Sequence, residues 1–233
     1  MGRGLFLIAA KVPDPGQVKT RLGRTIGMER AAALYSAFLV DLSNRFFANP
    51  GDDWEFDVGW AFAPADAGFA RILCDIGCPP LSPAVRFVAQ HGDGWDARQA
   101  NLLRWGHDHG YDRTVLVGSD SPHLPLSTIR EAFAALAVHD IALGRTLDGG
   151  YYLIGMRGYH DVLTGVPMST STVAEALTAR IIDRGLMLAE LPETFDVDEA
   201  ADLDHLRRAC APDGAAAPVS WAALRRLGLV EAL

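Results

Sequence analysis

Cysteine, lysine and long apolar segments are the features that this sequence has least of. Its 233 residues contain three cysteines, Cys74, Cys78 and Cys210, with no Cys-x-x-Cys pair and no histidine at metal-site spacing. This pattern argues against a disulfide framework or a structural zinc site, and we expect reduced thiols in a cytoplasmic protein. The longest apolar run near the start has six residues, and no later segment approaches the length of a membrane span, so we expect no targeting segment and no membrane partner.

An excess of positive charge is also absent. The formal net charge is −8 and the sequence pI is about 5.3. Nucleic acids and anionic membranes are bound by basic surfaces that replace counterions, so neither is expected as a partner. A small anionic substrate remains compatible with this composition wherever positive charge is concentrated locally.

Lysine is scarce, and its placement is informative. Nineteen of the twenty-one basic residues are arginine, and the two lysines lie eight residues apart in one segment. That segment, residues 11–22, is predicted as a loop that follows a buried strand over 5–9. The alternative is an ordinary solvated basic loop, and neither a P-loop nor a dinucleotide fingerprint is present. Prolines, a glycine and cations together are typical of a phosphate site, and the candidate residues are Lys11, Pro13, Gly16, Lys19 and Arg21.

A second polar strand exit lies in the middle of the chain. The β-branched run over 115–117 predicts a short buried strand, and it ends in Gly118, Ser119 and Asp120 before two prolines. In open α/β sheets ligands bind beyond the carboxyl ends of the strands, so Asp120 is a candidate metal or substrate ligand. The alternative is a loop aspartate that makes only a local hydrogen bond.

The hydrophobic pattern alternates between strands and helices. This order predicts a single three-layer α/β domain over residues 1–233, Rossmann-like, with a mostly parallel mixed sheet; its core covers about 4–210, and 211–233 form a C-terminal tail to which we assign no chemistry. Two capping boxes, Thr128 with Glu131 and Thr172 with Glu175, are predicted to begin helices. The other expected elements are strands over 54–63, 85–89, 140–145, 150–156 and 186–191, and helices over 28–47, 65–76 and 96–110.

Further polar residues follow the later strands. Asp196 and Asp198 lie on the last strand exit, although the acidic run that contains them is also typical of the first turn of a helix. Strand exits of a mostly parallel sheet meet at one edge, so these carboxylates and Asp120 are expected to converge. Oxygen ligands of this kind suit Mg²⁺, or Mn²⁺ in its place, together with a nucleoside triphosphate. The predicted wall of the cleft consists of Asp148, Gly149, Gly150, Ser169 and Thr170.

Five motifs in order, KVPDPGQVKTRL, GSDSPHLP, DGGYYLIG, PMST and FDVDEAADL, give the chain a family resemblance. It resembles a bacterial nucleotidyltransferase and glycosyltransferase family with the nucleotide-diphospho-sugar transferase (GT-A-like) fold, related to the 2-phospholactate guanylyltransferases. The resemblance implies phosphate binding by the first loop and magnesium binding by Asp120, Asp196 and Asp198. One segment departs from the family pattern: GDGWDARQA stands where the family has a sequence close to GDLGERM, and Arg98 takes the place of its arginine.

The residues and the resemblance together predict a magnesium-dependent enzyme that transfers a nucleotidyl group from a nucleoside triphosphate to a small phosphorylated or hydroxylated acceptor, with release of pyrophosphate. Lys19, Arg21 and Asp120 are the predicted catalytic residues, and Ser119 and Arg98 join the substrate-binding set. A nucleotide-sugar glycosyltransferase is the first alternative, although such enzymes usually carry Asp-x-Asp where this chain has one carboxylate. A non-catalytic nucleotide-binding module is the second. The sequence does not identify the acceptor, the base or the oligomeric state.

Overall fold

The computed structural model describes residues 2–48, 54–168 and 170–230. The strands are β1 (Gly4–Lys11), β2 (Phe56–Ala63), β3 (Arg86–Ala89), β4 (Arg113–Gly118), β5 (Ile141–Thr146), β6 (Tyr151–Arg157) and β7 (Leu188–Thr194). The helices are α1 (Thr20–Ile26), α2 (Met28–Phe46), α3 (Phe69–Asp75), α4 (Trp95–Asp108), α5 (Leu126–Ala135), α6 (Val173–Asp183), α7 (Asp202–Cys210) and α8 (Pro218–Arg226). Within the described residues, no helix has the length and apolar character needed to cross a membrane.

The strands form one sheet in the order β3-β2-β1-β4-β6-β5-β7. β1 pairs in parallel with β2 and β4, β2 with β3, and β5 with β7, whereas β6 is antiparallel to both of its neighbours. The predicted mostly parallel mixed sheet is therefore confirmed, with the β5–β6 hairpin as its antiparallel part. This topology brings the carboxyl ends of β1, β3, β4 and β7 to one edge, where open α/β sheets bind ligands.

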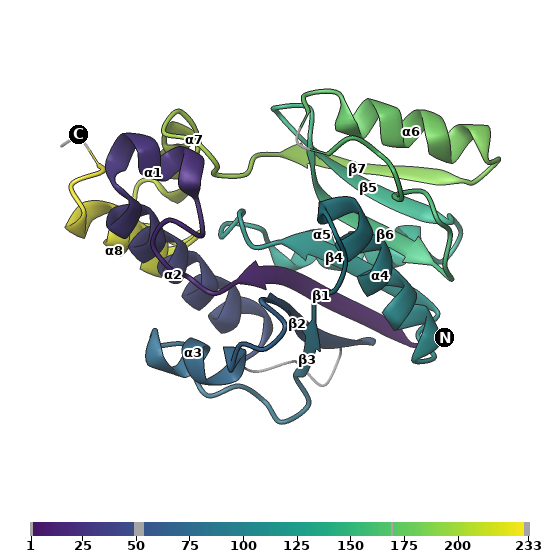
Figure 1. The fold of residues 1–233 in the computed structure, drawn as a ribbon, viewed down its shortest axis with the longest axis horizontal. Coiled ribbons are helices and arrows are strands. Elements are labelled where there is room, and N and C mark those ends of the chain that lie inside the picture. The colour runs from purple at the N-terminus through teal and green to yellow at the C-terminus, as the bar shows by residue number, and fades with distance from the viewer. Residues whose placement is uncertain (1, 49–53, 169, 231–233) are drawn as a thin grey trace.

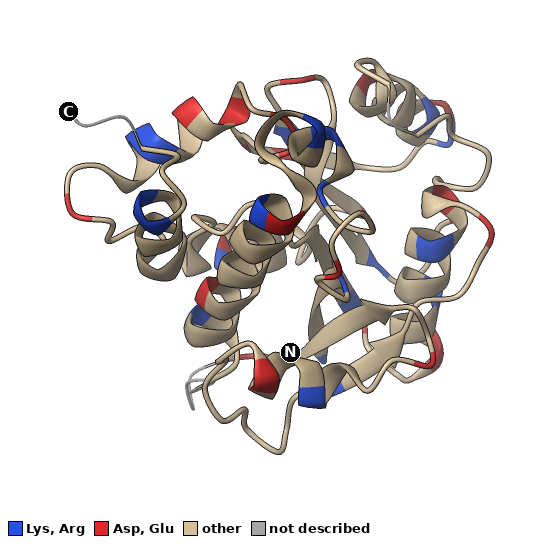
Figure 2. Ribbon diagram, turned by 60° about the vertical axis from the view of Figure 1, so that its left-hand side comes forward, with Lys and Arg blue, Asp and Glu red and all other residues tan. Residues whose placement is uncertain are grey.

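Helices cover both faces of the sheet (Figure 1). Alternate residues of a strand point to opposite faces, and in β1 Phe6 and Ile8 join one hydrophobic cluster while Leu5 and Leu7 join the other. The first cluster contains residues of α2, α5, α7 and α8, and the second contains residues of α4 and α6. The three predicted layers are present. In the view of Figure 2, basic and acidic positions are interspersed among the elements.

The C-terminal segment packs against α2. The buried Asp41 carboxylate accepts hydrogen bonds from the backbone N–H groups of Val219 (2.9 Å) and Ser220 (2.7 Å) and from the Ser220 hydroxyl (2.6 Å). One turn later, Arg45 donates to the backbone carbonyls of Leu124 and Ala216. The segment suggested by the sequence as a tail thus closes the first hydrophobic cluster and is joined through α2 to the loop that follows β4.

The structure differs locally from the sequence predictions. Residues 20–26 form α1 where the sequence predicted a loop, because Leu22 is a fully buried apolar anchor for this turn. The predicted capping box at Thr128 is wrong, since α5 already begins at Leu126 and Pro125 stands at its N-cap. Thr172 does occupy the N-cap of α6, but its side chain makes no capping hydrogen bond. The capping motif therefore placed the start of α6 correctly and the start of α5 too late.

Asp41→Ala tests how firmly α8 is held. The substitution leaves the buried donors of Ser220 without an acceptor, so we expect the free energy of unfolding to fall by about 3 kcal/mol. Urea unfolding followed by circular dichroism measures the change. Asp75→Ala is the control, because that carboxylate is exposed and makes an ion pair with Arg71 one turn away. This substitution should cost less than about 0.5 kcal/mol. Equal losses in the two variants would contradict the assigned role of Asp41.

Candidate active site

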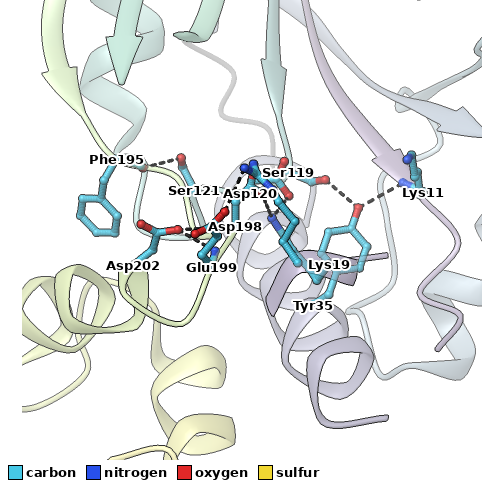
Figure 3. A network of polar contacts seen from close by, with 11 residues as sticks. Lys11, Lys19, Tyr35, Ser119, Asp120, Ser121, Phe195, Asp198, Glu199 and Asp202 are labelled. Carbon is cyan, nitrogen blue, oxygen red and sulfur yellow. Dashed lines mark hydrogen bonds and ion pairs between the residues drawn. The ribbon is translucent and has the colours of Figure 1, made fainter. Parts of the chain in front are cut away.

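A buried lysine joins two carboxylates at the carboxyl edge of the sheet (Figure 3). Lys19 stands at the N-cap of α1 in the left-handed conformation, with φ of 47°, and its side chain is 4% exposed. Its ammonium Nζ makes an ion pair with Asp120, which follows β4, and lies 2.9 Å from Oδ1 of Asp198, which follows β7. Three segments far apart in the sequence therefore meet at one ammonium group.

The charges of this cluster stabilise one another. Burial disfavours the Lys19 ammonium, but the carboxylates of Asp120 and Asp198 outweigh that effect and raise the pKa of Lys19 above its ordinary value. Burial likewise disfavours ionised Asp198, but Lys19 and Arg21 lower its pKa overall. Both groups are consequently charged at neutral pH.

Hydrogen bonds fix the segment that contains Asp198. Arg21 donates to Oδ2 of Asp198 (2.7 Å) and to Oε1 of Glu199 (3.1 Å). Oδ2 of Asp202, in the first turn of α7, accepts from the backbone N–H groups of Asp198 (2.9 Å) and Glu199 (2.7 Å). The acidic run is therefore divided between two roles: Asp202 holds the backbone at the start of α7, and Asp198 faces the cluster.

The same segment is tied to the exit of β4. The backbone N–H of Val197 donates to the carbonyl of Asp120 (3.1 Å), and the Ser121 hydroxyl donates to the carbonyl of Phe195 (2.8 Å). The His123 ring stacks on Phe195 with a centroid distance of 3.9 Å. These contacts set the position of Asp196 and Asp198 relative to Asp120.

Tyr35 of α2 connects the exits of β1 and β4, as Figure 3 shows. Its hydroxyl accepts a hydrogen bond from the backbone N–H of Lys11 (3.1 Å) and shares a second with the Ser119 hydroxyl (2.7 Å). Burial raises its pKa to about 12, so the phenol is protonated. The sequence prediction missed this residue, because a tyrosine in a helix with a buried apolar stripe gives no separate signal of a polar role.

Asp196 lies in an environment that opposes its ionisation. Burial, followed by the charges of Asp198, Asp120 and Asp148, raises its pKa from 3.8 to about 7. Among the described residues, none forms a hydrogen bond or an ion pair with its carboxyl group. A carboxyl group that titrates near neutral pH beside fixed charges is typical of functional sites.

Two cavities meet at the Lys19 cluster. The larger, about 540 Å³, is lined by the cations Lys11, Lys19, Arg21 and Arg98, together with Gln90, Ser119, Asp120 and Asp198. The smaller, about 360 Å³, is lined by Asp148, Gly150, Tyr151, Thr170 and Asp196. Arg21, Trp95, Gly118, Asp120 and Asp198 line both cavities. Volumes of this size are typical of small-molecule sites.

Most of the predicted site residues line one of these cavities, but three of the described ones line neither. Pro13 and Gly16 shape the loop after β1, where Gly16 has a φ of 77°. Gly149 supports the hairpin: it has a φ of 86°, and an added Cβ would collide with the carbonyl oxygen of Ser171. Ser169, also predicted, lies outside the described residues.

The sequence prediction also missed Gln90 and Trp95. The Gln90 amide donates to the carbonyls of Ala10 (3.1 Å) and Ala61 (2.8 Å), so it joins the exit of β3 to β1 and β2. Trp95 begins α4, is 39% exposed and lines both cavities. Their place on a polar, glycine-rich strand exit was the available signal.

The predicted magnesium ligands face a competing cation. In the described part of the chain, no group of three or more His, Cys, Asp or Glu side chains is arranged to hold a metal ion. Both oxygens of Asp198 bind Lys19 or Arg21, whereas the Asp120 side chain remains 39% exposed. The oxygen donors suit Mg²⁺ chemically, but Asp198 can accept it only if these cations turn elsewhere. The magnesium site stays a prediction.

Comparisons with known proteins agree with this architecture. Residues 54–170 match the family model described as "Uncharacterized protein conserved in bacteria (DUF2064)". A crystal structure from Desulfovibrio desulfuricans G20, described as a "putative nucleotide-diphospho-sugar transferase", is 31% identical, with a TM-score of 0.85, and the match covers 98% of this chain and 96% of that one. The expected fold is confirmed. No sequence among the curated proteins matches the chain.

More distant structures share the fold alone. A 4-diphosphocytidyl-2C-methyl-D-erythritol synthase from Anaerococcus prevotii DSM 20548 is 10% identical, with a TM-score of 0.52 and coverage of 88% of this chain and 94% of that one. A cytidylyltransferase from Leptospira borgpetersenii serovar Hardjo-bovis (strain JB197) is 13% identical, with a TM-score of 0.51 and coverage of 98% and 94%.

Asp196→Asn tests the charge of the site. The raised pKa means that the folded state binds the proton more tightly than the unfolded state, so this contribution to stability is present below about pH 4 and is lost as the pH rises to about 7. Asparagine stays neutral, so we expect the variant to exceed the wild type in free energy of unfolding by about 4 kcal/mol at pH 8. The difference should vanish near pH 4. Urea unfolding in buffer with EDTA measures both values, and no gain at pH 8 would contradict the raised pKa.

Proposed function

This chain belongs to the DUF2064 family of bacterial proteins, and we propose that it transfers a nucleotidyl group from a nucleoside triphosphate to a small acceptor, with release of pyrophosphate. The observation that supports this most directly is the larger cavity, where four cationic side chains surround the exit of β1 next to Asp120 and Asp198. Cations at the edge of an α/β sheet suit a polyphosphate, and the adjoining smaller cavity leaves room for a second substrate.

In the proposed reaction, an acceptor oxygen attacks the α-phosphorus of the bound triphosphate. A new oxygen–phosphorus bond forms, the bond from the α-phosphorus to the bridging oxygen breaks, and pyrophosphate leaves. Lys19 lines the larger cavity and Arg21 lines both, so the two cations are placed to neutralise the charge that grows on the leaving group. Positioning and electrostatics account for most of the rate enhancement in phosphoryl transfer.

Lys19 has a second role in the proposed reaction. In the structure described, its ammonium group neutralises Asp120 and Asp198. A triphosphate in the larger cavity competes for Lys19 and Arg21, and the released carboxylates would then hold Mg²⁺. That ion would supply positive charge to the phosphate oxygens. The buried ion pairs therefore keep the two carboxylates together until the nucleotide binds.

Glycosyl transfer from a nucleotide sugar is the second candidate. The observation that favours it is the description of the Desulfovibrio desulfuricans protein, which is 31% identical over nearly the whole chain. The same two cavities would then hold the nucleotide sugar and the acceptor. The single carboxylate at the exit of β4, where an Asp-x-Asp pair is usual in such enzymes, favours nucleotidyl transfer instead.

A thermal-shift panel of nucleoside triphosphates and nucleotide sugars, with and without Mg²⁺, distinguishes these functions. We expect at least one triphosphate to raise the melting temperature in a Mg²⁺-dependent manner, since it binds the cations of the larger cavity. Stabilisation by nucleotide sugars alone would favour glycosyl transfer. Binding of a triphosphate without pyrophosphate release across an acceptor panel would favour a non-catalytic nucleotide-binding module.

Asp120→Asn is the matching variant for this panel. It should abolish most of the Mg²⁺-dependent shift, measured from the melting temperature of the ligand-free variant. That melting temperature should itself fall, because Asp120 is one of the two carboxylates paired with the buried Lys19. Asp183→Asn, an exposed site at the end of α6, removes the same charge and should behave as the wild type. An unchanged Mg²⁺ dependence in Asp120→Asn would show that Asp120 is only a loop residue.

Lys19→Met and Arg21→Met test the role of the cations in turnover. Each removes a charge placed for the leaving group, so we expect kcat to fall about a hundredfold or more. Pyrophosphate release measures the rate once an acceptor is found. Arg24→Met is the control, because Arg24 is an exposed cation on the same helix that lines neither cavity. Full activity in Lys19→Met would contradict the proposed mechanism.

A further inference from the structure

We propose that the smaller cavity binds an acceptor that carries hydroxyl groups and no phosphate, a neutral or cationic polyol or sugar. This proposal rests on the proposed function and names the substrate class of its second site. The donor cavity and this one differ in charge, although they meet at the same cluster. We therefore expect the two substrates to differ in charge as well.

The charged side chains divide unequally between the cavities. The larger cavity is lined by four cations and two carboxylates. The smaller is lined by one cation, Arg21, by the carboxylates of Asp120, Asp148 and Asp198, and by the carboxyl group of Asp196. Like charges brought together at a binding site cost several kcal/mol, so a phosphate ester is strongly disfavoured in the smaller cavity. A triphosphate and an uncharged acceptor each match one cavity.

Arg21 does not offset this excess. Its guanidinium already donates to Asp198 and to Glu199, and if the nucleotide withdraws it, the smaller cavity loses its one cation among the lining residues described. A divalent cation on Asp120 and Asp198 would neutralise only these two shared carboxylates. Asp148 lines only the smaller cavity and would still face the acceptor.

The remaining wall suits a hydroxylated ligand. Thr170 and Ser171 bring hydroxyl groups from the segment before α6, and the carboxylates can accept hydrogen bonds from ligand hydroxyls. Tyr151 and Trp95 add aromatic surface, and the Tyr151 hydroxyl is held by the Gln99 amide (2.8 Å). Apolar rings with a few placed polar groups are typical of small-molecule sites. In the reaction, the acceptor hydroxyl oxygen bonds to the α-phosphorus, pyrophosphate leaves, and the hydroxyl proton passes to solvent.

Matched probe pairs test the proposal with the intact protein: glycerol against glycerol 3-phosphate, and glucose against glucose 6-phosphate. Each is supplied with a triphosphate that stabilises the protein in the thermal-shift panel. We expect the unphosphorylated member of a pair to have a kcat/KM higher by at least about tenfold. An equal or higher value for the phosphorylated member would overturn the proposal.

Asp148→Asn sharpens this comparison. Asparagine keeps an oxygen that can accept the backbone N–H of Gly150 (2.9 Å), so the turn is preserved while one negative charge is lost. The preference for the unphosphorylated probe should shrink severalfold in this variant and stay unchanged in Asp183→Asn, the remote charge control. An unchanged preference in Asp148→Asn would contradict charge selection by the cavity.

A crystallographic experiment needs no donor reaction and is therefore independent of the proposed function. Crystals of the protein are soaked in inorganic phosphate, and we expect none in the smaller cavity. Phosphate bound beside Asp148 and Asp196 would overturn the acceptor proposal, even if nucleotidyl transfer were demonstrated. Failure of every triphosphate to bind would contradict the proposed function instead. The soak would still show whether the smaller cavity excludes phosphate.

Discussion

The ion pairs of Lys19 with Asp120 and Asp198 are the interaction on which the site depends. They join the start of α1, the exit of β4 and the segment after β7, three positions that share no local sequence relationship. A lysine with a 4% exposed side chain is costly to bury unless its charge is matched, and here two carboxylates match it. The protein therefore holds an excess of negative charge at this edge of the sheet with a cation that belongs to the chain itself.

This arrangement also explains why two cavities with opposite character can adjoin. The cations lie at the end of β1, at the start of α1 and on α4, whereas the carboxylates follow β4, β5 and β7. Arg21 lines both cavities, and Lys19 pairs with the two carboxylates that the cavities share. β1 and β4 are adjacent in the sheet. The cations after β1 and the carboxylates after β4 therefore lie next to each other, each on its own side of the site.

The sequence predicted the layers, the sheet and most of the cavity-lining residues. Buried strands and the polar residues that follow them can be recognised from a few neighbouring residues, such as the apolar run before Gly118 and Asp120. It did not predict that Lys19 would lie between the carboxylates, because that depends on a left-handed backbone at one residue and on the packing of α1. Tyr35 was missed for a related reason: its partners, the backbone N–H of Lys11 and the Ser119 hydroxyl, are brought near it by the fold. The capping box at Thr128 gave the wrong start for α5, because the helix already begins at Leu126, before the motif.

Arg45 has a consequence for how this protein can diverge in sequence. Its guanidinium binds the backbone carbonyls of Pro122, Leu124 and Ala216, and every amino acid offers a carbonyl. The residues at these three positions can therefore change without losing the bond, whereas few side chains could replace a planar donor that reaches all of them. A change of side chain at Ala216 therefore leaves intact the link that runs from the C-terminal segment through Arg45 to the loop beside Asp120.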